Sequence, residues 1–539
     1  MSAASLAISV MAVCGIIGLI AYNGFAHFWP NDIERFTYHD TNGHTKRIFA
    51  ERVYDVDITT SQFLESGAPV QWAGEGDFTK RWLIKTGNRR INPPDFRWLY
   101  DKQLVTTDTP SDVLIIERSE WGNVYGTFEH LARGTKHEHQ GEHDLAQLYA
   151  SVERATALRR QIEDVERRQI GPINRRLERL RLQLSNLQRS DEQYVAKAAA
   201  MEIELQKLQA EYGVQDKRMQ ALRSQIAQDT VTLRDADGRK FIISVEKILH
   251  VWQPNTMHLG QKVAHFLGGI WRFVSDDPRE ANTEGGVFPA LFGTVLMVLI
   301  MSLMVTPLGV VAAIYLSEYA QQGPLVRMIR VAVNNLAGVP SIVYGVFGLG
   351  FFVYFVGGGI DQLFFSNTLP APTFGTPGLI WASLTLALLT LPVVIVSTEE
   401  GLQRIPRSQR EGSLALGATK AETLFNVIIP MASPAILTGV ILAVARAAGE
   451  VAPLMLVGVV KLAPSLPLDG EFPYLHLDRK FMHLGFHIYD VGFQSPNIEA
   501  ARPLVYATAL LLITLIIGLN LTAIALRNRL EQRFRGVDL

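Results

Sequence analysis

An arginine and a glutamate lie inside one of the most apolar stretches of the chain. Arg446 and Glu450 both fall within the run 435–460. Charged side chains are costly inside a bilayer and almost always face a polar interior or a pathway, so this pair predicts a functional site. Their i to i+4 spacing also lets the two charges neutralise each other on one helix face. A pair that serves only helix packing is therefore the alternative.

A second candidate site follows the apolar run 379–397. It contains Glu411, Gly412 and Ser413, then Gly417, and it ends at Pro430. This pattern predicts a short helix, a tight glycine turn, and a second helix that the proline ends before the next apolar run. An ordinary amphipathic loop is the alternative interpretation.

Other kinds of chemistry find little support. Four histidines, His130, His137, His139 and His143, are close in sequence, but their spacing matches no common zinc motif and is typical of solvated loop residues. The single cysteine, Cys14, excludes an internal disulfide. The chain contains no G-x-x-x-x-G-K-[ST] phosphate loop. We therefore predict no catalytic residue, metal or cofactor in this chain, and any energy from ATP would have to come from another subunit.

The composition of the 539 residues is split between two kinds of region. Only four charged residues lie between Gly285 and Thr398, whereas 26 lie between Ser151 and Gln228. The first region is suited to lipid and the second to water. The net charge of -1 argues against a nucleic-acid binder, which would carry a basic face.

Six apolar stretches are long enough to cross a bilayer, which takes about 20 residues of helix. The first lacks the basic start of a signal peptide, so we interpret it as an anchor. The stretches are 5–28, 288–316, 329–356, 379–397, 435–460 and 504–526.

Basic residues in the short loops predict the orientation, because such loops remain cytoplasmic. We expect both termini to be cytoplasmic and residues 30–283 to be outside. The basic residues are Arg327 and Arg330 in one loop, Arg404, Arg407, Arg410 and Lys420 in another, and Arg527, Arg529, Arg533 and Arg535 in the tail.

The outer segment is predicted to be an α+β domain. Strand-like patches occur at 46–58 and 112–128, and a hairpin is expected at 230–245. Between them, apolar residues from Ile173 to Ile226 alternate in steps of four and three, which indicates a coiled coil within about 141–228. Because strands flank the coil on both sides, we expect an antiparallel hairpin, with an intermolecular coil as the alternative.

Three further features refine this outline. Gly171-Pro172 should kink or end a helix, and Ser190-Asp-Glu-Gln193 resembles a capping box that begins the returning helix. The amphipathic stretch 257–274 is expected at the membrane surface. The predicted domains are thus the anchor 1–29, the insertion 30–283, and a membrane core 284–539 with its main loop at 399–432.

The segment from Arg410 to Pro430 resembles the E-A-A-x3-G-x9-I-x-L-P signature of ABC importer permeases. Glu411, Gly417 and Pro430 match it, while Gly412 and Ser413 replace its two alanines. The stretches 335–348, 391–401 and 445–454 look like the phosphate-specific permease of the PstA type. The resemblance covers about 285–534 and leaves the long insertion without a counterpart.

This resemblance implies an α-helical polytopic membrane protein with the type I ABC importer permease fold and six transmembrane helices, extended by the extracytoplasmic α+β domain with its coiled coil. It implies a permease subunit of a bacterial inner-membrane phosphate importer, and no enzyme. Glu411, Gly412, Ser413, Gly417 and Pro430 would couple it to the ATPase.

The implied partners are a second homologous permease, two copies of an ABC ATPase subunit, an extracytoplasmic phosphate-binding protein and the lipid bilayer, with no nucleic acid. Arg446 and Glu450 would lie on the substrate pathway. Two alternatives remain: a permease for another oxyanion, such as molybdate, sulfate or phosphonate, and a membrane-anchored sensor or scaffold that uses the external coil. Sensors usually need a cytoplasmic output domain, which this sequence lacks.

Overall fold

The computed structural model describes residues 2–74, 76–88, 93–133, 137–139, 142–186, 194–470, 472–495 and 498–535. The chain divides into two compact units. One unit is continuous and spans Phe28–Trp271, and the other joins Met1–His27 to Arg272–Leu539.

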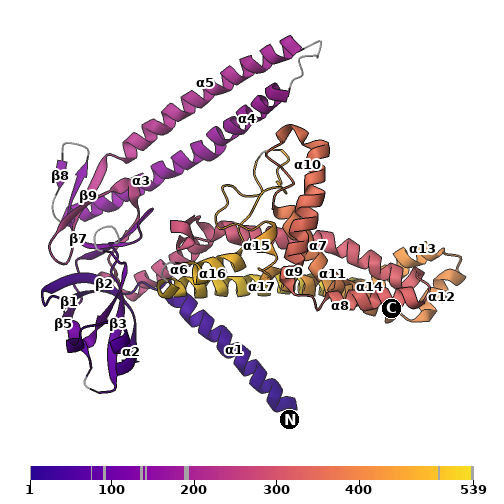
Figure 1. Cartoon of the computed structure of the whole chain (residues 1–539), viewed down its shortest axis with the longest axis horizontal. Coiled ribbons are helices and arrows are strands. Elements are labelled where there is room, and N and C mark those ends of the chain that lie inside the picture. The colour runs from indigo at the N-terminus through magenta and orange to yellow at the C-terminus, as the bar shows by residue number, and fades with distance from the viewer. Residues whose placement is uncertain are drawn as a thin grey trace. The chain divides into compact units, whose positions relative to one another are not determined.

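Two antiparallel sheets form the base of the continuous unit (Figure 1). The first has the order β4-β3-β2-β1-β5, and the second has the order β10-β9-β7-β6-β11 with β8 paired to β7. The predicted hairpin is present, with Lys240 opposite Arg234 and Ser244 opposite Thr230. The strands are β1 Ile33–His39, β2 Thr45–Thr59, β3 Phe78–Lys85, β4 Phe96–Tyr100, β5 Leu104–Asp108, β6 Val113–Arg118, β7 Val124–Arg133, β8 His137–His139, β9 Asp229–Arg234, β10 Lys240–Ser244 and β11 Ile248–Trp252.

Long helices extend from the second sheet. They are α3 Glu142–Asp164, α4 Gly171–Asn186 and α5 Tyr194–Ile226, and the unit also contains α2 Thr60–Glu65 and most of α6 Leu259–Ser275. Leu148 and Val152 of α3 are buried against Leu114 and Leu233 of the sheet. This apolar layer fixes the root of the helical arm on the sheet.

Helices α4 and α5 run side by side in opposite directions within one chain (Figure 1). Leu177 and Leu180 of α4 share a small apolar core with Leu208 of α5. Arg176 forms an ion pair with Glu204. The proposed capping box at Ser190 lies outside the described residues.

Pro172 neither ends nor sharply breaks the helical run from α3 to α4. A π-helical turn, Val165–Ile170, precedes it, and the N–H of Gly171 bonds to the carbonyl of Glu166, five residues back. A proline lacks the N–H that an α-helix would use, so the wider turn accommodates the missing bond.

Helix α6 leaves one apolar stripe exposed. Leu259, Val263, Leu267 and Trp271 recur every four residues on one face, and all four are exposed. Such a stripe is what a helix at a lipid surface presents, although its contact with a membrane remains a prediction.

The other unit is almost entirely helical. Its helices are α1 Ser2–Ala26, α7 Phe288–Ile314, α8 Pro324–Leu336, α9 Ser341–Phe347, α10 Gly358–Phe364, α11 Leu379–Gln403, α12 Arg407–Ala415, α13 Lys420–Thr423, α14 Ile429–Gly449, α15 Leu454–Val457, α16 Leu484–Phe493 and α17 Ile498–Arg535, with a small hairpin of β12 Pro278–Arg279 and β13 Glu284–Gly285.

Six helical runs of the described residues are long and apolar enough to cross a membrane, as the sequence predicted. They are Ala4–Ala26, Phe288–Tyr319, Ser341–Phe364, Leu379–Gln403, Lys420–Gly449 and Ala501–Arg529. The limits of two spans were predicted wrongly. The third begins at Ser341 instead of residue 329, and the fifth ends at Gly449 instead of residue 460.

Both errors come from a glycine followed by a proline inside apolar sequence. Gly338 and Pro340 separate α8 from α9, and Gly449 and Pro453 end α14. Proline disfavours a helical conformation in the residue before it and cannot donate a backbone hydrogen bond, so each helix stops although the hydrophobicity continues.

Helix α11 lies at the centre of the helical unit and is the most buried of the six spans. Small residues let α14 approach it closely. A Cβ on Gly401 would lie 2.4 Å from the Cβ of Ala435, and one on Gly439 would lie 2.8 Å from the Cβ of Ser397. Close approach through small residues is the usual way in which helices pack within lipid.

A buried polar cluster surrounds α16, near the start of α17. Asp490 has a buried carboxylate that pairs with Lys461 at 3.0 Å and accepts a 3.3 Å bond from Asn282. His487 and His483 are also buried. Burial lowers the pKa of each histidine to about 4, and for His487 the nearby carboxylate of Asp490 opposes this shift.

These histidines predict acid sensitivity of the fold. Their folded-state pKa of about 4 lies below the ordinary value of 6.5, so the unfolded chain binds protons first. The two histidines should contribute fully to the free energy of unfolding above pH 6.5. This contribution should fall as the pH drops from 6.5 towards 4. Thermal unfolding of the purified chain across this range measures it. His487→Gln should flatten the dependence, whereas His44→Gln, at an exposed site, should leave it unchanged; equal profiles for both variants would contradict the assignment.

Candidate functional site

The segment between α11 and α14 forms a compact helix-turn-helix. Helix α12 carries Glu411, Gly412 and Ser413, and Gly417 follows it with φ +91, a left-handed conformation that suits glycine. Thr419 then caps α13 through a reciprocal capping box with Glu422. The sequence thus folds as predicted up to this point.

Pro430 does not end the second helix, contrary to the prediction. The helical run continues from Lys420 to Gly449. A π-helical turn, Leu424–Ile428, precedes the proline, and the N–H of Ile429 bonds to the carbonyl of Leu424. As at Pro172, the wider turn allows the helix to continue without the hydrogen bond that the proline cannot donate.

The helix-turn-helix is fastened to the end of α7. The guanidinium of Arg410 forms a 3.1 Å ion pair with Glu318, whose side chain is only 10% exposed, and it donates to the carbonyl of Leu402 at 2.6 Å. From the second helix, the ammonium of Lys420 donates to the carbonyl of Glu318 at 2.7 Å. Residue Glu318 therefore holds both halves of the segment.

Apolar and hydroxyl contacts complete this attachment. Ile405, Leu424 and Ile428 pack on Ile314 of α7 and Leu402 of α11. The hydroxyls of Ser413 and Thr423 lie 2.9 Å apart and link the two short helices. The segment is therefore a rigid projection of the helical unit.

This projection exposes several large apolar side chains among its charged ones. Leu416 is 91% exposed, and Leu414 and Phe425 are exposed as well. Glu411 and Gly412 are exposed beside them, and a Cβ on Gly412 would meet no atom within 4 Å. These exposed apolar side chains have no role in the core of the helical unit.

Arg446 and Glu450 meet at the broken end of α14. The Arg446 Nε lies 3.5 Å from the Glu450 Oε1, and both side chains are partly buried. Arg446 is in the last turn of α14, where the partial negative charge of the helix end favours a cation. Glu450 is the C-cap residue, with extended backbone.

The broken end is still deep in the bundle. Gly439 packs on Ser397 and Ala435 on Gly401, so α14 and α11 are antiparallel. Arg446 is seven residues after Gly439, and seven residues back from Ser397 is residue 390, near the middle of α11. Arg446 is therefore near the end of its own helix but level with the middle of α11.

Helix α9, which begins just after the interruption that follows α8, lies against the turn after α14. A Cβ on Gly345 would lie 2.7 Å from the Cα of Pro453. The hydroxyl of Tyr344 donates to the carbonyl of Leu336 at 2.7 Å, next to the break, and Tyr344 is near enough to Arg446 for electrostatic interaction. Two broken helices and one arginine thus share a single region.

Several of these residues were missed in the sequence. Leu416 directly precedes the turn glycine Gly417 and lies just beyond the end of α12, so the predicted turn is the signal that could have identified it. Glu318 is one of four charged residues in a long apolar stretch, and a rare charge there predicts a partner. Nothing in the sequence identifies Arg410 as that partner.

No group of three metal-binding side chains occurs among the described residues. His130 contacts the hydroxyl of Thr232 at 3.1 Å. The side chains of His137, His139 and His143 lie outside the described part of the chain.

Comparison with known proteins agrees with this architecture. Residues 305–536 match the family of binding-protein-dependent transport system inner membrane components. The chain is 37% identical to the phosphate transport system permease protein PstA of Mycobacterium leprae, over 47% of this chain and 74% of that protein.

Two further relatives come from distant organisms. One is the probable phosphate transport system permease protein PstA of Methanocaldococcus jannaschii, 32% identical over 40% of this chain and 67% of that protein. The other is the probable ABC transporter permease YqgI of Bacillus subtilis, 31% identical over 43% of this chain and 74% of that protein.

The chain belongs to the PstA-type ABC permeases. This PstA-type chain is a multi-pass inner-membrane permease subunit, and it is not an enzyme. The matched residues 305–536 contain the helix-turn-helix and both broken helices.

Loss of the Arg410 guanidinium should loosen the helix-turn-helix of this PstA-type permease. Arg410→Gln leaves the nearly buried Glu318 carboxylate without its partner, which costs about 3 kcal/mol. Local opening should therefore increase by about a hundredfold. Thermolysin cleavage near Leu414 and Leu416 measures this opening. Arg407→Gln removes an exposed charge from the same helix and should change cleavage little; equal rates in both variants would show that the ion pair does not hold the segment.

Proposed function

We propose that this chain is the transmembrane permease subunit of an ATP-driven phosphate importer. The observation that carries the proposal is the meeting of two interrupted helices around Arg446. Broken helices near the middle of the bundle are typical of substrate sites in transporters, because irregular backbone at that depth has to be buried or to line a polar cavity.

Arg446 suits an oxyanion in transit. Its guanidinium supplies a fixed positive charge and N–H donors in a planar fork that matches phosphate oxygens. Glu450, 3.5 Å away, competes for the same donors. The anion is therefore held only transiently, and the ion pair re-forms when it leaves.

Phosphate is favoured over other oxyanions by the relatives. Those of M. leprae and M. jannaschii are named as phosphate transport system permeases. A permease for molybdate, sulfate or phosphonate is the alternative, and it would use the same arginine chemistry. Competition between labelled phosphate and these anions during uptake distinguishes the two.

The helix-turn-helix is proposed as the docking element for the ATPase. Glu411, Gly412, Ser413, Gly417 and Pro430 would form or shape it, and exposed Leu416 would fill a pocket of the partner. Two ATPase copies, a second homologous permease and an extracytoplasmic phosphate-binding protein would complete the importer. ATP and Mg would be bound by the ATPase subunits.

The unit Phe28–Trp271 is proposed to lie outside the cytoplasm. The support is the predominance of basic residues in the loops on the α12 side, which predicts that side to be cytoplasmic. Both termini are then cytoplasmic. The alternative of a membrane-anchored sensor or scaffold would assign the main function to the α4–α5 arm, and it leaves the exposed surface of α12 unexplained.

Docking is tested with a residue that contributes nothing to the fold of the chain itself. Leu416→Asp changes a 91% exposed side chain, so the chain should insert and remain as stable as before. The ATPase should no longer copurify, and substrate-stimulated hydrolysis should fall at least about tenfold. Leu64→Ser, at an exposed site in the other unit, is the control.

Glu411→Lys combined with Gly417→Val should act in the same direction; full hydrolysis by that variant complex would refute the docking role.

Transport is tested at Arg446. Arg446→Gln keeps similar volume but loses the charge, and a bidentate charged contact contributes about 3 kcal/mol, so phosphate uptake should fall about a hundredfold. Arg446→Lys keeps the charge without the fork and should be intermediate. Assembly should be unchanged, as judged by copurifying subunits, and Arg502→Gln, at an exposed position, should transport normally. Near-normal uptake by a well-assembled Arg446→Gln complex would leave the pair with a packing role only.

A further inference from the structure

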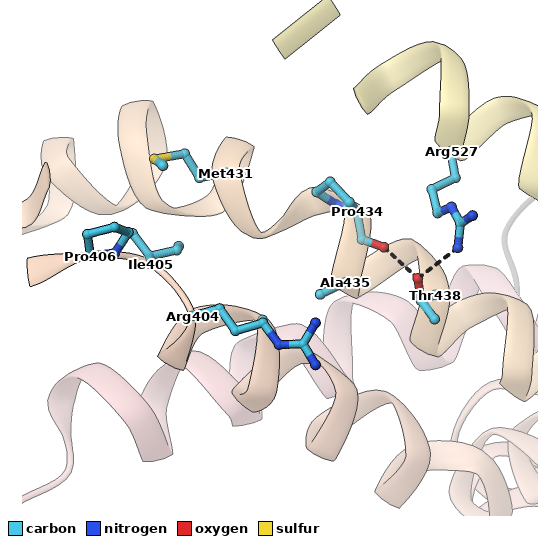
Figure 2. A pocket seen from close by; sticks show the side chains of 9 residues that line it. Arg404, Ile405, Pro406, Met431, Pro434, Ala435, Thr438 and Arg527 are labelled. Carbon is cyan, nitrogen blue, oxygen red and sulfur yellow. Dashed lines mark hydrogen bonds between the residues drawn. The ribbon is translucent and has the colours of Figure 1, made fainter. Parts of the chain in front are cut away.

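Two arginines line a cavity that has no part in the function proposed above. The cavity has a volume of about 470 Å³ and lies where the end of α11, the start of α14 and the end of α17 come together (Figure 2). Arg404 and Arg527 line it from two different helices, and Thr438 and Met431 contribute from α14. It adjoins Pro406, the residue that caps α12.

The two guanidinium groups are directed toward the Thr438 side of the cavity (Figure 2). Arg527 donates to the hydroxyl of Thr438 at 3.4 Å and to the side chain of Asn528 at 3.3 Å. These bonds are longer than strong N–H···O bonds, and both acceptors are neutral. The donors of Arg527 are therefore weakly engaged and available to a better acceptor.

Arg404 is still less constrained. Its side chain is 81% exposed, and Glu400 lies at the ion-pair limit of 4.0 Å. Such a contact in water contributes little. The cavity therefore presents two flexible or weakly bound cations beside a hydroxyl, while Met431, Ile405 and Ala435 supply apolar walls.

We propose that this cavity binds a phosphate group, carried either by an anionic lipid headgroup or by inorganic phosphate. Two guanidinium groups from separate helices match the geometry of phosphate oxygens. Basic pockets between transmembrane helices on the cytoplasmic side are suited to anionic lipid headgroups. The apolar wall favours a lipid, whose glycerol and acyl carbons would continue past Met431.

Binding here would tie α17 to the root of the helix-turn-helix. Arg527 belongs to α17, while Arg404 and Pro406 directly precede or cap α12. An anion held by both arginines would resist separation of these elements. If the ligand is inorganic phosphate, the site would respond to imported substrate on the exit side, and this reading rests on the proposed transport function. The lipid reading rests only on the proposed orientation of the membrane.

Binding is measured on the purified full chain, together with any subunits that copurify with it. The only native cysteine is replaced by Cys14→Ala, and Met431→Cys carries an environment-sensitive fluorophore at the wall of the cavity. Dioctanoyl phosphatidylglycerol, its zwitterionic phosphatidylcholine counterpart, inorganic phosphate and chloride are titrated separately at constant ionic strength. Arg404→Gln and Arg527→Gln are compared with Arg529→Gln, which removes an exposed charge from the same end of α17.

Saturable binding of phosphatidylglycerol or of inorganic phosphate, weakened about tenfold by each cavity variant but not by Arg529→Gln, is the expected result. Phosphatidylglycerol alone would identify a lipid site, and inorganic phosphate in addition would identify a site for the free anion. If a cavity variant fails to purify, Arg527→Lys keeps the charge and should still weaken binding. No saturation beyond chloride, or equal weakening by Arg529→Gln, would overturn the proposal. Because no transport is measured, that outcome would leave the proposed function untouched.

Discussion

A helix that stops inside a bundle of transmembrane helices must find partners for its free backbone groups, and the end of α14 at Gly449 imposes this constraint on its surroundings. The chain beyond it turns tightly: the N–H of Leu454 bonds to the carbonyl of Val451, and that of Gly458 to the carbonyl of Leu454. The N–H of Gly378, at the start of α11, donates a hydrogen bond to the carbonyl of Val457. Unsatisfied groups at this depth cost several kcal/mol each, so the break, the short helix α15 and the start of α11 are one interlocked structure. Arg446 occupies the negative end of α14 within it.

Close packing around that break depends on residues without side chains. A Cβ on Gly348 would lie 2.3 Å from the hydroxyl oxygen of Thr385, and one on Gly458 would lie 2.7 Å from the carbonyl oxygen of Gly378. Gly345 meets Pro453 in the same way. Because lipid offers helices no hydrophobic drive to associate, such contacts supply much of the cohesion through van der Waals packing. The backbone around Arg446 is therefore closely packed, which suits the proposed role of this arginine on the substrate pathway.

The sequence predicted the number of spans, the glycine turn at Gly417 and the sheet hairpin. Each of these depends only on local hydrophobic periodicity or on a single residue type. It did not predict where α9 begins or where α14 ends, since Pro340 and Pro453 interrupt helices without interrupting hydrophobicity. For Pro172 and Pro430 the error has the opposite direction, because the sequence predicted a helix end or kink that does not occur. Both prolines follow π-helical turns and leave the helical run intact. A proline alone does not decide between these outcomes. The Arg410 to Glu318 ion pair was also beyond sequence reasoning, because it joins elements that only the fold brings together.

The two proposed sites share one element. The helical run from Lys420 to Gly449 has 30 residues, which at about 1.5 Å per residue is about 45 Å long. Lys420 at its start is held by the carbonyl of Glu318, and Arg446 lies in its last turn. A displacement of the helix-turn-helix would therefore reach the arginine along one continuous helical run, without passing through any loop. The π-helical turn at Leu424–Ile428 is the one irregular stretch described within this run, and it lies at the docking end. The π-helical turn precedes α14, and Pro434 lies inside α14, so bending is easiest in the first part of the run. The part after Pro434 is packed on α11 through Gly439 and continues to Arg446.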